Sequence, residues 1–107
     1  MDAALDHRQA RIIALKDLVR TRERLRDNHI LQIEQRALDK RNEQRIHALP
    51  VERRNELETH IDELMMARLR EELECWKDTA PLLRELVTLT TFPFEYGSGL
   101  ETDGGLP

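Results

Sequence analysis

Apolar residues recur every three or four positions along most of this 107-residue chain, which is the spacing of an amphipathic helix. The strongest run follows Pro50 and holds these positions: Leu57, Ile61, Leu64, Met65, Leu69, Leu73 and Trp76. Another stripe, near the N-terminus, holds Leu5, Ile12, Leu15 and Val19. Each stripe predicts a helix with an apolar face that must be covered by another element.

Proline and glycine divide the chain into segments. All four glycines lie at 97, 99, 104 and 105, whereas the prolines stand at 50, 81, 93 and 107. Proline ends a helix or opens one in its first turn. We therefore expect helical tracts at about 3–49, 51–78 and 80–91, with Asp78 or Thr79 capping the last tract.

The tract 3–49 is long for one globular helix. Between Val19 and Ile30 its only apolar residue is Leu25, and the dipeptide Asp27-Asn28 stands in that gap. Asp and Asn cap helix N-termini, and Asn also tolerates the left-handed position at a helix C-terminus. The sequence is compatible with one helix or two, and we favour a break or kink at Asp27-Asn28.

The chain changes character near its C-terminal end. Glycine-rich residues 97–107 predict a flexible tail, which leaves a single helical domain at 1–96. The last tract and the aromatic stretch "FPFEY" hold more apolar residues than one short helix needs. The candidate partner-binding residues are therefore Leu82, Leu83, Leu86, Phe92, Phe94 and Tyr96. The alternative, which we favour for the three aromatics, is that they fold back and staple the helices together.

Charge is spread unevenly along the chain. Charged residues make up 36% of it, and its formal net charge is −4. Residues 1–54 hold 13 Lys and Arg against 9 Asp and Glu, which gives +4, whereas residues 55–107 hold 4 against 12, which gives −8. The two halves attract each other, so folding back or dimerising is favoured over binding a polyanion.

Four arginines alternate in "RTRERLR", residues 20–26. On a helix Arg20 and Arg24 share one side while Arg22 and Arg26 share another, so the run does not form one basic patch. Asp17, Glu23 and Asp27 are placed to pair with them along the same helix. Because the chain is acidic and no aromatic residue is interleaved, we predict a solvated or salt-bridged face and no nucleic-acid binding.

Candidate chemistry is sparse. Glu56, His60 and Glu63 share one helical face, but a solvated face holds such residues far more often than a metal does, and Cys75 is expected to be a partly buried structural residue. No nucleophile elbow, phosphate loop or zinc spacing occurs. We expect no enzyme, and no metal, cofactor or small-molecule substrate.

The sequence also predicts where in the cell the protein is located. No apolar run approaches the roughly 20 residues that span a membrane, and the N-terminus has no signal-peptide core. A single cysteine excludes an intrachain disulfide framework. These features predict a cytoplasmic protein that does not insert into a membrane.

The predicted architecture is all-α, a small bundle of three to four helices with a long N-terminal tract. Its apolar stripes exceed what one chain can cover, so a homodimer is expected to complete the core. The residues assigned to this core or dimer interface are Ile12, Leu15, Val19, Leu57, Ile61, Leu64, Met65, Leu69, Leu73 and Trp76.

The expected function is to bind another protein and to occlude a surface of it. In size, acidity and helical make-up the chain is similar to bacterial anti-activators, which sequester a transcription regulator, and to small secretion chaperones. The likeness is one of composition, and of the two roles we favour the anti-activator. A structural coiled-coil subunit of a larger assembly is the alternative, and it predicts one long helix through residue 27.

Overall fold

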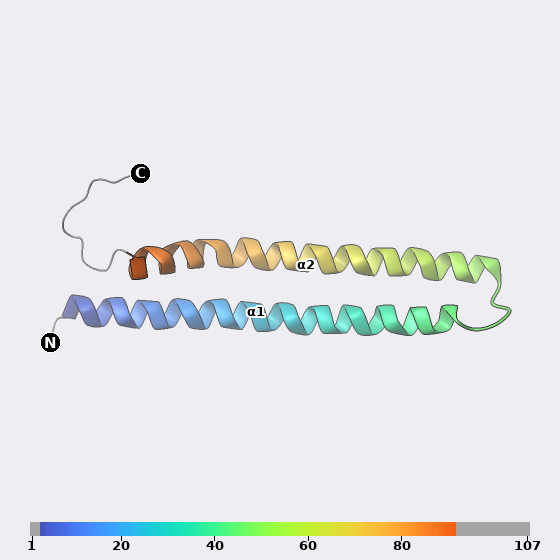
Figure 1. Cartoon of the computed structure of the whole chain (residues 1–107), viewed down its shortest axis with the longest axis horizontal. Coiled ribbons are helices and arrows are strands. Elements are labelled where there is room, and N and C mark those ends of the chain that lie inside the picture. Colours follow the sequence, from blue (N-terminus) through green and yellow to red (C-terminus); the bar gives the residue numbers. More distant parts are fainter. Residues whose placement is uncertain (1–2, 92–107) are drawn as a thin grey trace. The chain divides into compact units, whose positions relative to one another are not determined.

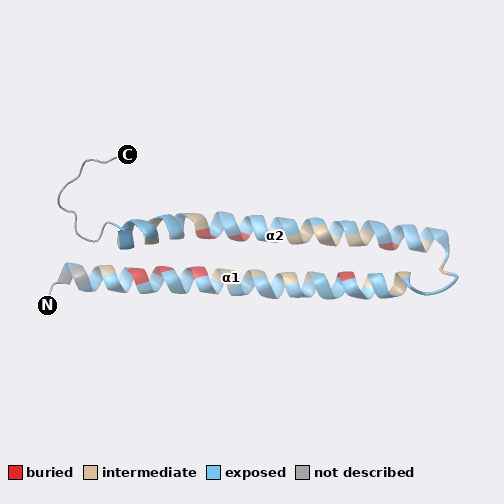
Figure 2. Cartoon of the chain, in the orientation of Figure 1, coloured by how far each residue is buried: buried red, intermediate tan, exposed pale blue. Residues whose placement is uncertain are grey.

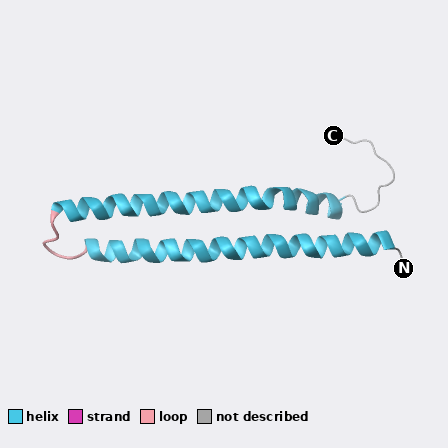
Figure 3. Ribbon diagram, turned by 180° about the vertical axis from the view of Figure 1, so that it is seen from behind, coloured by secondary structure: helices cyan, strands magenta, loops and turns pink. Residues whose placement is uncertain are grey.

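The computed structural model describes residues 3–91 and contains two helices (Figure 1). Helix α1 spans Ala3–Gln44, helix α2 spans Val51–Thr91, and a loop joins them (Figure 3). No strand occurs in this described part of the chain, which confirms the all-α prediction. The predicted third and fourth helices are absent from it, since the tracts expected at 51–78 and 80–91 form one helix.

Helix α1 runs without a break through Asp27 and Asn28, so the favoured break at this dipeptide was wrong. Both residues are exposed on the helix surface. The cost of Asp or Asn in a helix interior is only about 0.7 kcal/mol each relative to Ala. Continuing the helix places Ile30, Ile33 and Ala37 against α2, and the burial of these side chains outweighs that cost.

Helix α2 continues through Asp78 and Thr79, which the sequence predicted to cap a new helix. Thr79 is only 5% exposed and lies inside the packing instead of at a helix end. Pro81 therefore stands in the interior of α2. Leu82, Leu86 and Leu89 beyond it are half-buried, so the packing of the last three turns favours continuing the helix.

The chain divides into two compact units. The described part of unit 1 consists of residues 3–21 and 78–91. Its buried residues are Ile12, Leu15 and Val19 of α1 and Thr79 of α2. Figure 2 marks the buried stretches of both helices in red. Arg11 and Glu85 form a two-pronged ion pair at its surface, with Nε–Oε2 and Nη2–Oε1 distances of 2.8 Å each.

Unit 2 is Arg22–Lys77 and consists of a helical hairpin. Leu57 is fully buried, Ala37 is fully buried and Cys75 is 2% exposed. Near the loop, the guanidinium of Arg53 donates to both carboxylate oxygens of Glu43, at 2.6 and 2.9 Å. This bidentate pair joins the end of α1 to the start of α2 and favours one register, because both N–H groups must align with the two carboxylate oxygens.

The loop of unit 2 contains a strained residue. Ala48 has φ of +66°, the left-handed region that an L-residue other than glycine, Asn or Asp avoids. The next residues start α2, since the Pro50 carbonyl accepts the N–H of Arg54 at 3.0 Å. Pro50 thus occupies the cap position, directly before the predicted tract 51–78.

Replacing Ala48 by glycine is expected to raise the free energy of unfolding by about 0.5–1 kcal/mol. Glycine adopts positive φ without the roughly 1–2 kcal/mol that an L-residue loses there, although its freer unfolded chain offsets part of the gain. Urea unfolding followed by circular dichroism measures the change. Ala10→Gly, at an exposed position inside α1, is the matched control and should lower stability by about 0.5–1 kcal/mol. Equal losses in both variants would contradict the strain at Ala48.

Candidate interaction surfaces

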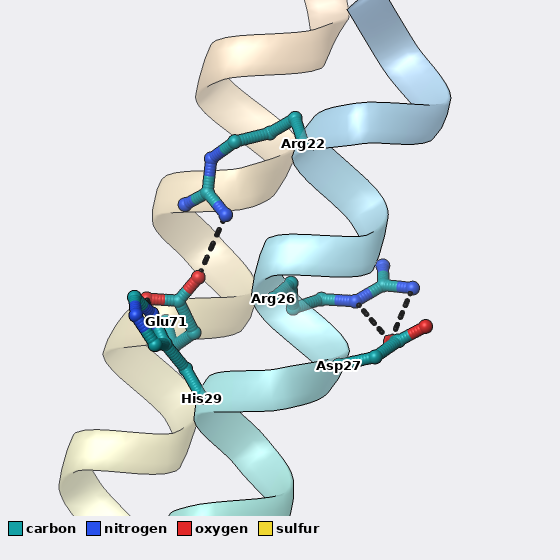
Figure 4. A network of polar contacts seen from close by, with 5 residues as sticks. All are labelled: Arg22, Arg26, Asp27, His29 and Glu71. Atoms are coloured by element: carbon teal, nitrogen blue, oxygen red, sulfur yellow. Dashed lines mark hydrogen bonds and ion pairs between the residues drawn. The ribbon is translucent and has the colours of Figure 1, made fainter. Parts of the chain in front are cut away.

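A partly buried polar layer joins α1 and α2 within unit 2 (Figure 4). Nη1 of Arg22 on α1 lies 2.8 Å from Oε2 of Glu71 on α2, and Nδ1 of His29 lies 3.1 Å from Oε1 of the same carboxylate. The side chains of Arg22 and Glu71 are only 17% and 16% exposed. Because both oxygens of Glu71 have partners from α1, the layer ties the two helices at one register.

The surroundings of Glu71 act on its acidity in opposite directions. Partial burial alone would raise the pKa of this carboxyl, but hydrogen bonds from Arg22 and His29, together with their charges, hold the pKa below its ordinary value. The folded state therefore favours the carboxylate. A carboxyl with a lowered folded pKa stabilises the fold above its unfolded pKa, and this stabilisation is lost as the pH falls through the folded pKa.

Replacing Glu71 by glutamine is expected to lower stability at pH 7 by about 1–2 kcal/mol, because a charge-assisted interaction is lost. The difference from the parent chain should be full above about pH 4.3, the ordinary value for Glu, and should shrink at lower pH. Urea unfolding at pH 7 and at pH 3 measures both. Glu63→Gln, at an exposed position of α2, is the control and should change stability little at either pH. A pH-independent loss in Glu71→Gln would contradict the ionic role.

The arginine run is divided between solvent and interior. Arg20 pairs with Asp17, three residues away, at 3.7 Å, as the sequence predicted. Arg26 pairs instead with the adjacent Asp27, with Nη2–Oδ1 at 3.0 Å. Arg22 reaches across to α2, which the sequence did not predict. The run therefore forms no single basic face, and the residues that line an open groove beside it carry both signs of charge, among them Arg36, Arg70 and Glu74.

The long apolar stripe predicted on α2 belongs to two different faces. Leu57 is buried and Ile61, Leu64 and Met65 are half-buried, whereas Leu69, Leu73 and Trp76 are 54%, 55% and 66% exposed. A step of four residues passes a full helical turn by about 40°. The successive steps 65–69–73 therefore carry the stripe around the helix. Leu69, Leu73 and Trp76 lie outside the buried core of the described residues, and their place in a dimer interface stays a prediction.

We call the exposed residues Met66, Leu69, Leu73 and Trp76 the outer row of unit 2. Met66 is 53% exposed and lies on the same side of α2 as Leu69, Leu73 and Trp76. Glu71 and Cys75, which are half-buried and buried, point in the opposite direction on the same helix. This part of α2 thus has one apolar face whose four residues are each more than half exposed, and exposed contiguous apolar residues mark interaction sites.

Unit 1 has a smaller exposed surface, the unit 1 patch, which consists of Leu83, Val87 and Thr90 at spacings of four and three. Leu83 is 41% exposed and Val87 57%. Leu82 and Leu86, also predicted to bind a partner, are half-buried between the helices of unit 1. Phe92, Phe94, Tyr96 and the predicted tail 97–107 lie outside the described residues, so the choice between staple and interface stays open.

The candidate chemical groups lie on α2. Cys75 was predicted to be partly buried, and it is buried. Oε1 of Glu56 accepts a hydrogen bond from Arg53 at 2.7 Å. Within residues 3–91, no group of three or more His, Cys, Asp or Glu side chains is placed to hold a metal ion. Neither described helix has a stretch apolar enough to cross a membrane.

Comparison with known proteins found no matching protein family, no similar curated protein and no similar solved structure.

Proposed function

We propose that the chain binds another protein through the unit 1 patch and occludes the surface that it covers. The single observation that carries this proposal is the exposure of Leu83 and Val87 on a side of α2 that the described residues of unit 1 do not cover. Large apolar side chains in line on a helix are the anchors by which one helix packs against another protein.

The surroundings of the unit 1 patch suit burial in an interface. Residues 79–91 contain only two charged residues, Arg84 and Glu85, and Glu85 is already paired with Arg11. The cores of protein interfaces are likewise depleted in charged residues. The hydroxyl of Thr90 donates to the backbone carbonyls of Leu86 and Val87, at 2.9 and 3.3 Å. A partner can therefore cover Thr90 without leaving its hydroxyl donor unsatisfied.

The size of the patch sets a limit on affinity. Full burial of a Val or Leu side chain stabilises by about 1.5–3 kcal/mol, so covering the exposed parts of Leu83 and Val87 contributes about 1 kcal/mol each. Association costs about 4–15 kcal/mol in lost freedom. A stable complex therefore requires a partner that reaches beyond these two side chains or that meets two copies at once.

Among specific roles we favour an anti-activator that sequesters a transcription regulator, with a small secretion chaperone as the nearest other binding role. The structural coiled-coil subunit remains the alternative from a different class. One observation favours it: α1 continues through residue 27, as that hypothesis predicted. Light scattering on the purified chain separates the classes, because a scaffold forms elongated higher assemblies and a binding regulator does not.

The proposal is tested with Leu83→Asp and Val87→Asp as baits in a pull-down from the native host, beside the parent chain. We expect one identified partner to be lost from both variants. Thr88→Asp is the matched control, since Thr88 is exposed on the same helix but about 100° or more around it from Leu83 and Val87. If the partner is a transcription regulator, its target promoter should be repressed by the parent chain and not by Leu83→Asp.

Two results count against the proposal. Capture of the same proteins by the parent chain and by both patch variants would show that the unit 1 patch binds nothing. Loss of capture in Thr88→Asp as well would show that the effect lies in folding, which circular dichroism of each bait checks.

A further inference from the structure

The outer row of unit 2 has the spacing of a coiled-coil seam. Met66, Leu69, Leu73 and Trp76 follow one another at three, four and three residues, which places them at the a and d positions of heptads. Each of the four is between 53% and 66% exposed. A seam with this repeat is covered most directly by a helix that carries the same repeat, because knobs of one then enter holes of the other.

The charged residues that flank the outer row differ in sign between its two edges. Arg70 and Lys77 follow one edge, at the e positions, and Glu72 stands on the other edge, at a g position. All three are exposed. Their ion pairs within the chain are long: Nζ of Lys77 is 3.8 Å from Glu74, and Glu72 is 4.0 Å from Nε of Arg68. Exposed pairs of this kind exchange partners at little cost.

We propose that the outer row binds the outer row of a second copy of the chain, with the two α2 segments parallel. In a parallel pair a g residue faces the e residue five positions further along the other helix, so Glu72 of each copy meets Lys77 of the other, twice across the two-fold axis. An antiparallel pair would instead set Glu72 against Glu72, and Arg70 and Lys77 against each other. Charge complementarity thus selects both the occupant and its direction.

The proposal goes beyond the proposed function, because it concerns unit 2 and requires no other protein. It also gives each assembly two unit 1 patches. Two linked sites bind a partner that offers two contacts with higher avidity than one site does.

Sedimentation equilibrium of the full chain tests the pairing, together with the fluorescence of Trp76, the single tryptophan. The parent chain is expected to reach twice its 12.6 kDa mass at micromolar concentration, with Trp76 emission moving to shorter wavelength as dimer forms. Leu73→Asp should raise the dissociation constant by at least about 100-fold, because it places a charge in the seam. Leu31→Asp, at a residue of α1 outside the row that is 65% exposed, should leave the dimer unchanged.

Charge reversal tests the direction and does not depend on the seam variant folding. Glu72→Lys and Lys77→Glu, made singly, should each weaken the dimer about tenfold, because two attractive pairs become repulsive. The double reversal, Glu72→Lys with Lys77→Glu, should restore the parent affinity within about threefold, since attraction returns. A monomeric parent chain, or equal association of the parent and Leu73→Asp, would overturn the proposal. Stronger association of Lys77→Glu alone would overturn the parallel direction.

Discussion

Replacing Leu15 by alanine should lower the free energy of unfolding by about 2–5 kcal/mol, one of the largest losses that a single substitution in this chain can cause. Leu15 is fully buried in unit 1, between Ile12 and Val19 of the same apolar stripe. The substitution removes its transfer free energy and leaves a cavity whose walls relax only partly. A small domain has only about 5–15 kcal/mol of stability in total. Urea unfolding followed by circular dichroism gives the change.

Hydrogen exchange should show which part of the chain loses stability when Leu15 is replaced. Amides of residues 3–21 and 78–91 should exchange faster in Leu15→Ala, since these segments make up unit 1. Ile13→Ala is the matched control, because Ile13 lies two residues away and is 60% exposed. It should change stability by no more than about 0.5 kcal/mol. A loss below about 1 kcal/mol in Leu15→Ala would contradict the core assigned to unit 1.

The periodic stripes identified the helices, and they identified the core only where the spacing stayed near 3.6 residues. Ile12, Leu15 and Val19 alternate steps of three and four, and all three are buried. The run from Met65 to Leu73 takes two steps of four and leaves the packed face. The number of apolar residues therefore predicts the helix. Only the angle of each residue around the helix axis separates the covered face from the outer row.

The polar layer could not be predicted from local patterns. Arg22 and Glu71 are 49 residues apart, and charged residues are almost never buried unless they are paired. The sequence contains one signal for this layer. The buried and half-buried positions of α1 recur every three or four residues, and Arg22 and Arg26 occupy two of them. The others in this series are Val19, Ile30 and Ile33. Such polar residues in an apolar repeat fix register at a cost in stability.

The helix boundaries show how packing overrides local signals. Asp27, Asn28, Asp78 and Thr79 are all good cap residues, yet none of them ends a helix. Helix α1 ends at Gln44, five residues before the predicted limit at 49, whereas α2 begins at Val51 as predicted. Between them the chain turns at Ala48, and Pro50 precedes α2. A cap residue stabilises a helix end where one occurs, but the covered faces of the two helices decide where the chain turns.

Replacing Pro81 by alanine should raise the free energy of unfolding by about 1–3 kcal/mol, the largest gain we expect from one substitution. Within a continuous α2, Pro81 has no N–H to donate to the carbonyl of Lys77, and its ring crowds that carbonyl. Alanine restores the donor, and because position 81 is exposed no packing is lost. Greater freedom of the unfolded chain keeps the gain below the full proline penalty of about 3 kcal/mol.

Thermal unfolding followed by circular dichroism measures the effect of Pro81→Ala, at about 4–8 °C of midpoint shift per kcal/mol for a domain of this size. Pro50→Ala is the matched control: Pro50 precedes α2, where no helical N–H is needed, so alanine should give no gain there. The experiment also separates the two descriptions of this region. If α2 ended near residue 78 and Pro81 opened a new helix, proline would suit its position and Pro81→Ala would be neutral or destabilising. A gain in stability therefore supports one helix through Pro81, and a loss would restore the break that the sequence alone predicts.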